Sequence, residues 1–133
     1  MSMTMARLAV ERGARDVFDK YFTTKDGTRE DWEHYINLDD LDMGDPRLCV
    51  IGQMAPVISD LVIGQHRATY NDALRALDRA FGTYTYRIIP GSEECLSWAI
   101  RYGFDSGPDF TYADLQDAWT DEIQSRLDKL SRG

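Results

Sequence analysis

The sequence has few cysteines, and they do not form a recognisable motif. Its 133 residues include only Cys49 and Cys95, which lie far apart in separate apolar stretches with no Cys-x-x-Cys spacing. A chain of this length buries roughly two-thirds of its unfolded surface on folding, so it does not depend on disulfides or a structural metal. We therefore expect two reduced, buried thiols, as is typical of a reducing cytoplasm.

Long apolar runs are also missing. The most hydrophobic stretch, residues 48–64, is interrupted by Gln53, Pro56 and Asp60, so it falls short of the ~18 uninterrupted apolar residues that a membrane span needs. The N-terminal segment is charge-rich and lacks the apolar centre of a secretory signal. These absences predict a cytoplasmic protein without a membrane segment.

Basic side chains are outnumbered. The chain has 15 Lys and Arg against 23 Asp and Glu, giving a formal net charge of −8. The acidity is concentrated in residues 22–47, with three basic and eight acidic side chains, and in residues 91–133, with four and nine. Such a surface is unsuited to neutralising phosphates, so we expect no nucleic-acid binding and a protein partner with a basic surface.

The residues that are present predict one mainly α domain spanning 1–133. No repeat or flexible linker divides the chain, and its apolar content of 43% is ordinary for a globular domain. Apolar residues at intervals of three and four predict about six helices. The predicted helices cover 6–21, 29–36, 46–55, 66–81, 92–102 and 112–130. Gly13 lies beside the buried face of the first helix and predicts a close approach of another backbone there.

Local end signals support several of these boundaries. Asp45 followed by Pro46 is typical of a helix start, and we expect that helix to stop before Pro56. Gly103 with an apolar residue after it predicts a glycine C-cap. Thr111 and Asp114 have the spacing of a capping box, which predicts the start of the last helix.

A small β-ribbon is compatible with two further segments. Residues 83–89 alternate with a period of two and end at Pro90-Gly91, which predicts a strand. Residues 57–63 are rich in β-branched side chains and fit either a strand or the continuation of a helix. If both are strands, they pair as an antiparallel ribbon around the helix between them.

No motif for a metal, a nucleotide or catalysis is complete. An EF-hand loop starting at Asp40 would need glycine and glutamate where Asp45 and Ile51 stand. Four residues could supply sulfur or nitrogen ligands for zinc, but no two of them have the short spacing along the chain that is typical of zinc sites: Cys49, Cys95, His34 and His66. Glycine-rich phosphate loops with a nearby lysine are absent. We therefore predict neither a metal site nor a cofactor.

Aromatic residues are numerous, with three Trp, seven Tyr and five Phe. Most are expected in the core, because aromatic side chains contribute large buried areas. An exposed remainder would be suited to a partner or to a homodimer, because aromatics also anchor interfaces.

Three elements resemble a group of small actinobacterial and actinobacteriophage proteins. They are Leu38-Asp39-Asp40-Leu41-Asp42, Cys49-Val50-Ile51-Gly52-Gln53, and a late Gly103-Phe104 followed by Ala118-Trp119. Residues 54–92 have no counterpart in that pattern and are interpreted as an insertion. The resemblance implies a bacterial or phage setting and no particular catalytic activity.

Charge and setting together predict a protein-interaction module rather than an enzyme. For a phage accessory protein, the obvious target is a basic host protein, which an acidic face can engage by charge complementarity. The residues predicted to bind this partner are Trp32, Asp39, Asp40, Asp42 and Asp45. One alternative is a small enzyme or ligand binder using Cys49, Gln53 or His66, and another is a self-associating structural protein.

Overall fold

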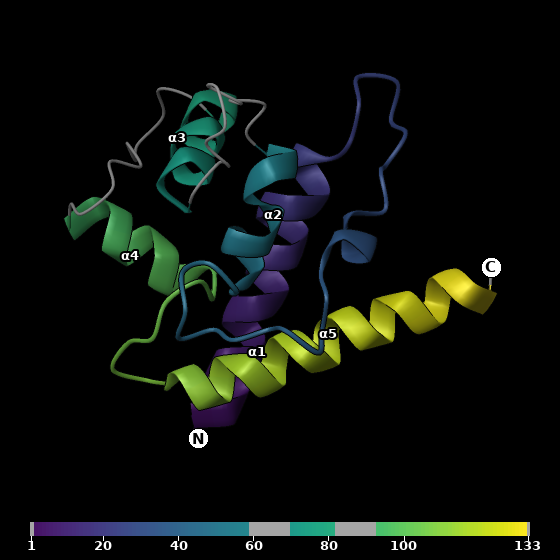
Figure 1. Ribbon diagram of the computed structural model, residues 1–133. Helices are drawn as coiled ribbons and strands as arrows, with labels where there is room; N and C mark the ends of the chain where they lie inside the picture. Colours follow the sequence, from purple (N-terminus) through teal and green to yellow (C-terminus); the bar gives the residue numbers. More distant parts are fainter. Residues whose placement is uncertain (1, 59–69, 82–92, 133) are drawn as a thin grey trace.

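The computed structural model describes residues 2–58, 70–81 and 93–132, and these form a mainly helical protein (Figure 1). The elements are α1 (Ser2–Arg12), the π-helix η1 (Gly13–Asp19), the 3₁₀ helix η2 (Trp32–Tyr35), α2 (Val50–Ile58), α3 (Tyr70–Phe81), α4 (Glu93–Arg101) and α5 (Tyr112–Arg132). The prediction of a mainly α fold is confirmed. Within those three described ranges there is no strand, and isolated β-bridges join only Thr23 to Arg29 and Gly107 to Phe110.

The first predicted helix is present as α1 followed directly by η1, and it crosses α5 (Figure 1). Its buried face includes Ala6, Val10 and Phe18. The close approach predicted at Gly13 is confirmed, because a Cβ at this position would lie 2.1 Å from the backbone oxygen of Tyr102. The switch to π-helical hydrogen bonding at Gly13 has no counterpart in the sequence prediction.

The predicted helix at 29–36 is reduced to the single 3₁₀ turn η2. Arg29 instead pairs with Thr23 in an isolated β-bridge, and the Glu30 amide donates to the Phe22 carbonyl at 2.9 Å. The backbone groups of Arg29 and Glu30 therefore pair with residues 22 and 23 across a tight turn at Gly27, which has a φ of +86°, and they are not available for helical hydrogen bonds. The remaining residues are too few for more than one turn.

The third helix is shifted toward the C-terminus relative to its prediction. Residues 46–48 form a turn in which the Leu48 and Cys49 amides donate to the Asp45 carbonyl, and α2 begins only at Val50. The prediction that the helix stops before Pro56 is wrong, because α2 continues through Pro56 to Ile58. An internal proline costs about 3 kcal/mol, and burial of the apolar side of α2 offsets that cost here.

The proposed ribbon is not confirmed. Residues 57 and 58 belong to α2, so the helical interpretation holds for this part of the segment. The rest of the first predicted strand, 59–63, and all of the second, 83–89, lie outside the described residues. The predicted helix at 66–81 is present from Tyr70 onward as α3, which packs against α2.

Both local end signals in the C-terminal part are confirmed. After α4, the amide of Gly103 donates to Ile100 and that of Phe104 donates to Ala99, with Gly103 at a φ of +76°. This is the Schellman arrangement, in which glycine takes the left-handed conformation. At the start of α5, the backbone amides of Thr111 and Asp114 each donate to the other's side chain, which completes the capping box.

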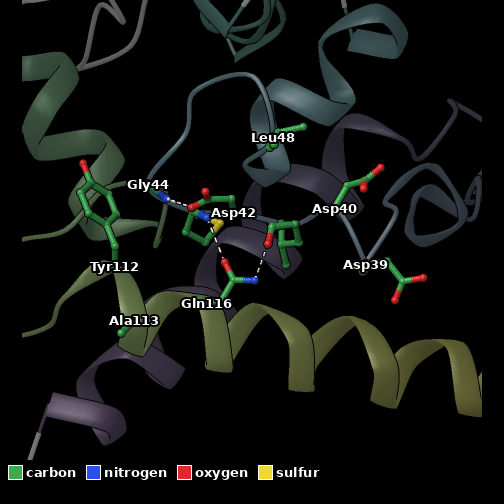
Figure 2. Close-up of a pocket in the computed structure, with 10 residues that line it drawn as sticks. Asp39, Asp40, Asp42, Gly44, Leu48, Tyr112, Ala113 and Gln116 are labelled. Atoms are coloured by element: carbon green, nitrogen blue, oxygen red, sulfur yellow. Dashed lines mark hydrogen bonds between the residues drawn. The ribbon is translucent and has the colours of Figure 1, made fainter.

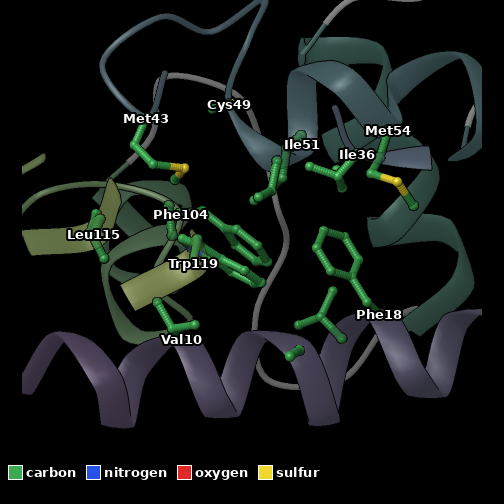
Figure 3. Close-up of a cluster of buried hydrophobic side chains, with 14 of the residues drawn as sticks. Val10, Phe18, Ile36, Met43, Cys49, Ile51, Met54, Phe104, Leu115 and Trp119 are labelled. Atoms are coloured by element: carbon green, nitrogen blue, oxygen red, sulfur yellow. The ribbon is translucent and has the colours of Figure 1, made fainter. Parts of the chain in front are cut away.

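The core lies where α1, η1, α2 and α5 meet, with aromatic rings at its centre (Figure 3). The Phe18 ring lies 4.8 Å from Trp32, 5.5 Å from Phe104 and 5.9 Å from Trp119, measured between centroids. The Trp119 indole nitrogen donates to the Gly103 carbonyl at 2.6 Å, so this large side chain is buried without an unpaired donor. The prediction that most aromatics are core residues is correct for all three tryptophans.

Candidate functional site

The acidic connection between η2 and α2 lies beside the first turns of α5 and forms one side of a hollow (Figure 2). The hollow has a volume of about 550 Å³ and is open to solvent. We call it the acidic groove and define it by its lining residues: Asp39, Asp40, Leu41, Asp42, Met43, Gly44, Leu48, Tyr112, Ala113 and Gln116. Three of these are aspartates, and none of the ten is basic.

The alternation of acidic and apolar residues in this loop determines which side chains reach the groove. Leu41 and Met43 are buried in the core, whereas Asp40 and Asp42 are exposed. The loop is built of turns, in which the Leu41 amide donates to the Leu38 carbonyl at 3.4 Å and the Asp45 amide donates to the Asp42 carbonyl at 3.1 Å. Burial of Leu41 and Met43 therefore holds the neighbouring carboxylates toward solvent.

Gln116 of α5 braces the middle of the loop through both ends of its amide (Figure 2). Its Oε1 accepts the Met43 amide at 2.9 Å, and its Nε2 donates to the Leu41 carbonyl at 2.6 Å. The two contacts satisfy backbone groups that an irregular loop would otherwise leave to water. They fix the loop relative to α5.

Gln53 of α2 braces the two ends of the same loop. Its Oε1 accepts the Asn37 amide at 2.7 Å, while its Nε2 donates to the carbonyls of Asn37 and Leu48 at 3.1 and 3.0 Å. Sequence reasoning missed Gln116 and assigned Gln53 to a different role, because a lone glutamine gives no local signal of the distant backbone that it contacts.

The four predicted aspartates are not equivalent. Asp39, Asp40 and Asp42 are exposed and line the acidic groove. Asp45 does not line it, and its carboxylate is paired with Arg47 at 3.2 Å. Hydrogen bonding to Arg47 holds the pKa of Asp45 below its ordinary value. The carboxylate of Asp45 is therefore already paired with a cation of the same chain, unlike the three aspartates that line the groove.

The expectation that Trp32 is an exposed member of this surface is wrong. Its side chain is 0% exposed, packs against Phe18, and donates from its indole nitrogen to Asp19 at 2.8 Å. Trp32 is therefore a core residue, separated from the acidic groove. The aromatic residue that does reach the groove is Tyr112, which is 42% exposed. A hydrogen bond from its hydroxyl to Asp105 raises the pKa of Tyr112 and fixes its ring.

The structure describes the surroundings of two of the three residues predicted for the alternative ligand site, Cys49 and Gln53. Cys49 is 2% exposed, and burial raises the pKa of its thiol to about 11, so it is protonated at neutral pH. Gln53 is committed to the loop backbone, and His66 lies outside the described residues. Cys49 and Gln53 therefore do not form a reactive pair.

The described residues include no group of three or more His, Cys, Asp or Glu side chains placed to hold a metal ion. None of the described helices combines the length and apolar character required to span a bilayer. Comparisons of the chain with protein-family models, curated proteins and solved structures give no match. The resemblance to actinobacterial and phage proteins thus stays a prediction.

Proposed function

We propose that this protein is an interaction module whose acidic groove binds a basic segment of another protein. The observation that carries the proposal is the set of three exposed aspartates on a doubly braced loop, beside a hollow with no basic lining residue. Opposite charges across an interface favour encounter and suppress binding of acidic competitors. A groove of this kind is suited to lysine and arginine side chains.

The braces contribute to affinity by limiting loop motion. Binding to a mobile loop costs free energy because the loop must become ordered, and a loop already fixed avoids most of that cost. Gln53 and Gln116 fix the backbone on both sides of Asp39, Asp40 and Asp42. The carboxylates are therefore presented in one arrangement before a partner arrives.

The neutral part of the groove supports arginine as a preferred contact. The Tyr112 ring and the aliphatic side chains of Leu48 and Ala113 line the same hollow as the aspartates. A guanidinium can stack on an aromatic face while its donors reach carboxylates, and its flat surface is less strongly hydrated than an ammonium. We expect arginine-containing segments to bind more tightly than lysine-containing ones.

The proposed biological role combines this groove with the resemblance stated above. In a phage or actinobacterial setting, the partner is a host protein with a basic surface, such as one that itself binds nucleic acid. Occupation of that surface by the acidic groove would block it by charge complementarity.

Neutralising the groove tests the proposal. In the variant Asp39→Asn, Asp40→Asn, Asp42→Asn, the side-chain size and most hydrogen-bonding capacity are kept while three charges are removed. Partners are captured from an actinobacterial lysate at low and high salt and identified by mass spectrometry. We expect a basic partner whose affinity for the variant falls by about tenfold, since each exposed charge pair contributes roughly 0.2–1 kcal/mol.

The matched control removes three charges elsewhere on the surface. Asp117, Asp121 and Asp128 are exposed on α5 and lie outside the acidic groove, so their replacement by Asn gives the same net charge. Equal loss of binding in both triple variants would show that only net charge matters and would contradict the assignment of the groove. Light scattering of the purified protein tests self-association, the remaining alternative.

A further inference from the structure

The side of α1 that faces away from the core combines exposed apolar and basic side chains. Met5 and Leu8 are 39% and 48% exposed, whereas Val10 on the opposite side is buried. Arg12 and Arg15 follow Leu8 at intervals of four and three, so they lie on the same side of the continuous helix formed by α1 and η1. We call Met5, Leu8, Arg12 and Arg15 the basic stripe.

The two arginines of the basic stripe keep donors for a partner. The Arg15 side chain is 65% exposed, and its pair with the neighbouring Asp16 at 3.0 Å is an exposed contact of the kind that contributes little. Arg12 is partly buried and donates from its Nε to the Leu8 carbonyl at 3.3 Å. A guanidinium has several N–H donors, and this bond uses one of them. Both arginines can therefore pair with carboxylates of another molecule.

The acidic groove has the complementary chemistry. It presents three exposed aspartates beside Leu48 and the ring of Tyr112 (Figure 2). Four large apolar side chains are exposed in the described part of the chain, and three of them belong to the stripe or the groove: Met5, Leu8 and Tyr112. Contact between the two surfaces would remove apolar area from water and bring opposite charges together.

We propose that the basic stripe of a second copy of this chain occupies the acidic groove, so that self-association regulates access of the basic partner. In this contact, Arg12 and Arg15 pair with the aspartates of the groove, and Leu8 packs on its apolar lining. The inference rests on the proposed function, because it names a competitor for the same site. It differs from a purely structural self-association, because the second copy is displaced when the partner binds.

The basic stripe is suited to a groove because it is part of a formed helix. Helices that bind in grooves use side chains separated by three and four positions, which is the spacing of Leu8, Arg12 and Arg15. The helix is held against α5, and the loop of the groove is braced by Gln53 and Gln116. Both surfaces exist before they meet, so association has a small ordering cost.

The net charge of −8 on each copy opposes association but acts over a longer range than the contact itself. At physiological ionic strength the screening length is about 8 Å, so charges far from the contact are largely screened. Arginines placed directly against carboxylates are closer than this and keep most of their attraction. We therefore expect a weak, reversible association, as is required of an occupant that a partner displaces.

Sedimentation velocity of the full chain over a range of concentrations tests the contact. We expect the average mass of the unmodified protein to rise with concentration. In Arg12→Glu, Arg15→Glu, attraction becomes repulsion at two positions, and the association constant should fall by about tenfold or more. The matched control is Arg7→Glu, Lys20→Glu, which changes two exposed cations outside the stripe and gives the same net charge. It should associate more strongly than the stripe variant.

Mixing two defective variants keeps the test decisive. A groove variant, Asp39→Arg, Asp40→Arg, has an intact stripe, whereas the stripe variant has an intact groove. Neither should self-associate alone, but an equimolar mixture should, because the intact surface of each meets the intact surface of the other. Recovery in the mixture also shows that both variants are folded. A mass that does not rise with concentration in the unmodified protein, equal weakening in the control, or no association in the mixture would each overturn the proposal.

Partner capture separates this inference from the proposed function. The stripe variant has a free groove, so at high protein concentration it should capture more of the basic partner than the unmodified protein does. Equal capture by both would overturn the regulation proposed here and leave the partner in place. Self-association through the stripe with no basic partner captured by any variant would contradict the proposed function and leave the contact between copies in place.

Discussion

At the scale of single residues, the acidic groove depends on two glutamines that carry no charge. Gln116 and Gln53 hold the backbone of the loop, whereas the aspartates beside them are turned to solvent. Acidity was visible in the sequence because charge is a property of each residue alone. The braces were not, because all their backbone partners except Leu48, which is five positions from Gln53, are 16 to 75 residues away along the chain.

Replacing Gln116 by Ala should loosen the loop and weaken partner binding. Two hydrogen bonds to loop backbone are lost, and we expect the free energy of unfolding to fall by about 1–3 kcal/mol. Urea unfolding measures the change. The control is Gln124→Ala on the same helix, where the exposed side chain donates to Asp128 one turn further along α5. Equal destabilisation by both changes would contradict the bracing role.

The thiol of Cys49 should resist alkylation in the folded protein. Burial raises its pKa to about 11, so the reactive thiolate is scarce at neutral pH, and the side chain is also inaccessible. Iodoacetamide labelling followed by peptide mass spectrometry should show slow modification at Cys49, which accelerates only when denaturant is added. Rapid labelling of the native protein would instead support the alternative ligand site.

At the scale of the helices, boundaries set by neighbouring residues were predicted well. The glycine cap after α4 and the capping box of α5 involve residues within a few positions of each other, so the sequence contains the whole interaction. The start of α2 and the reduction of 29–36 to η2 depend on contacts with residues outside the predicted helices. Here α2 begins four residues later than predicted, at Val50, and only Trp32–Tyr35 is helical. The same applies to the π-helical hydrogen bonding of η1.

Gly13→Ala should be destabilising because two elements meet there without space for a side chain. The added Cβ would lie 2.1 Å from the Tyr102 carbonyl oxygen, so η1 or the chain that follows α4 has to move. We expect a loss of about 1–3 kcal/mol, measured by chemical denaturation. In the control Gly44→Ala, the nearest atom is 3.4 Å away, and the change in stability should be small.

At the scale of the whole molecule, exposed and partly buried charged side chains are arranged differently. The exposed loop has unpaired acidic character, while acids and arginines at the junction of η1, η2 and α5 neutralise one another. Buried charges require such compensation, whereas exposed ones are solvated by water. Net charge alone therefore does not describe where a partner can bind.

Global stability should decrease in acid, partly through Asp19. Burial alone would raise the pKa of Asp19, but hydrogen bonds from Arg126, Trp32 and Arg29 together hold it below the ordinary value of 3.8. A carboxylate with a lowered folded-state pKa stabilises the protein above the unfolded pKa and loses this effect as pH falls through the folded pKa. The contribution of Asp19 should thus begin to decrease near the unfolded pKa, at about pH 4, and be lost as the pH falls through the lowered folded-state pKa.

Urea midpoints measured from about pH 5 to pH 2 test this expectation. Asp19→Asn should be less stable than the unmodified protein at the upper end of the range, and the difference should shrink toward the lower end. A constant difference across the range would show that Asp19 contributes by shape and packing rather than by charge.

The sequence by itself determined the mainly helical fold, the end signals at Gly103 and at Thr111 with Asp114, and the acidity of residues 37–45, because each depends on residue type or on neighbours within a few positions. Only the tertiary structure decided that Trp32 is buried, that Asp45 is paired while Asp39, Asp40 and Asp42 line a groove, and that Glu33 faces two arginines. The physical reason is distance along the chain. Burial and ion pairing depend on which remote segments come together, and Arg126 meets Glu33 across 93 positions.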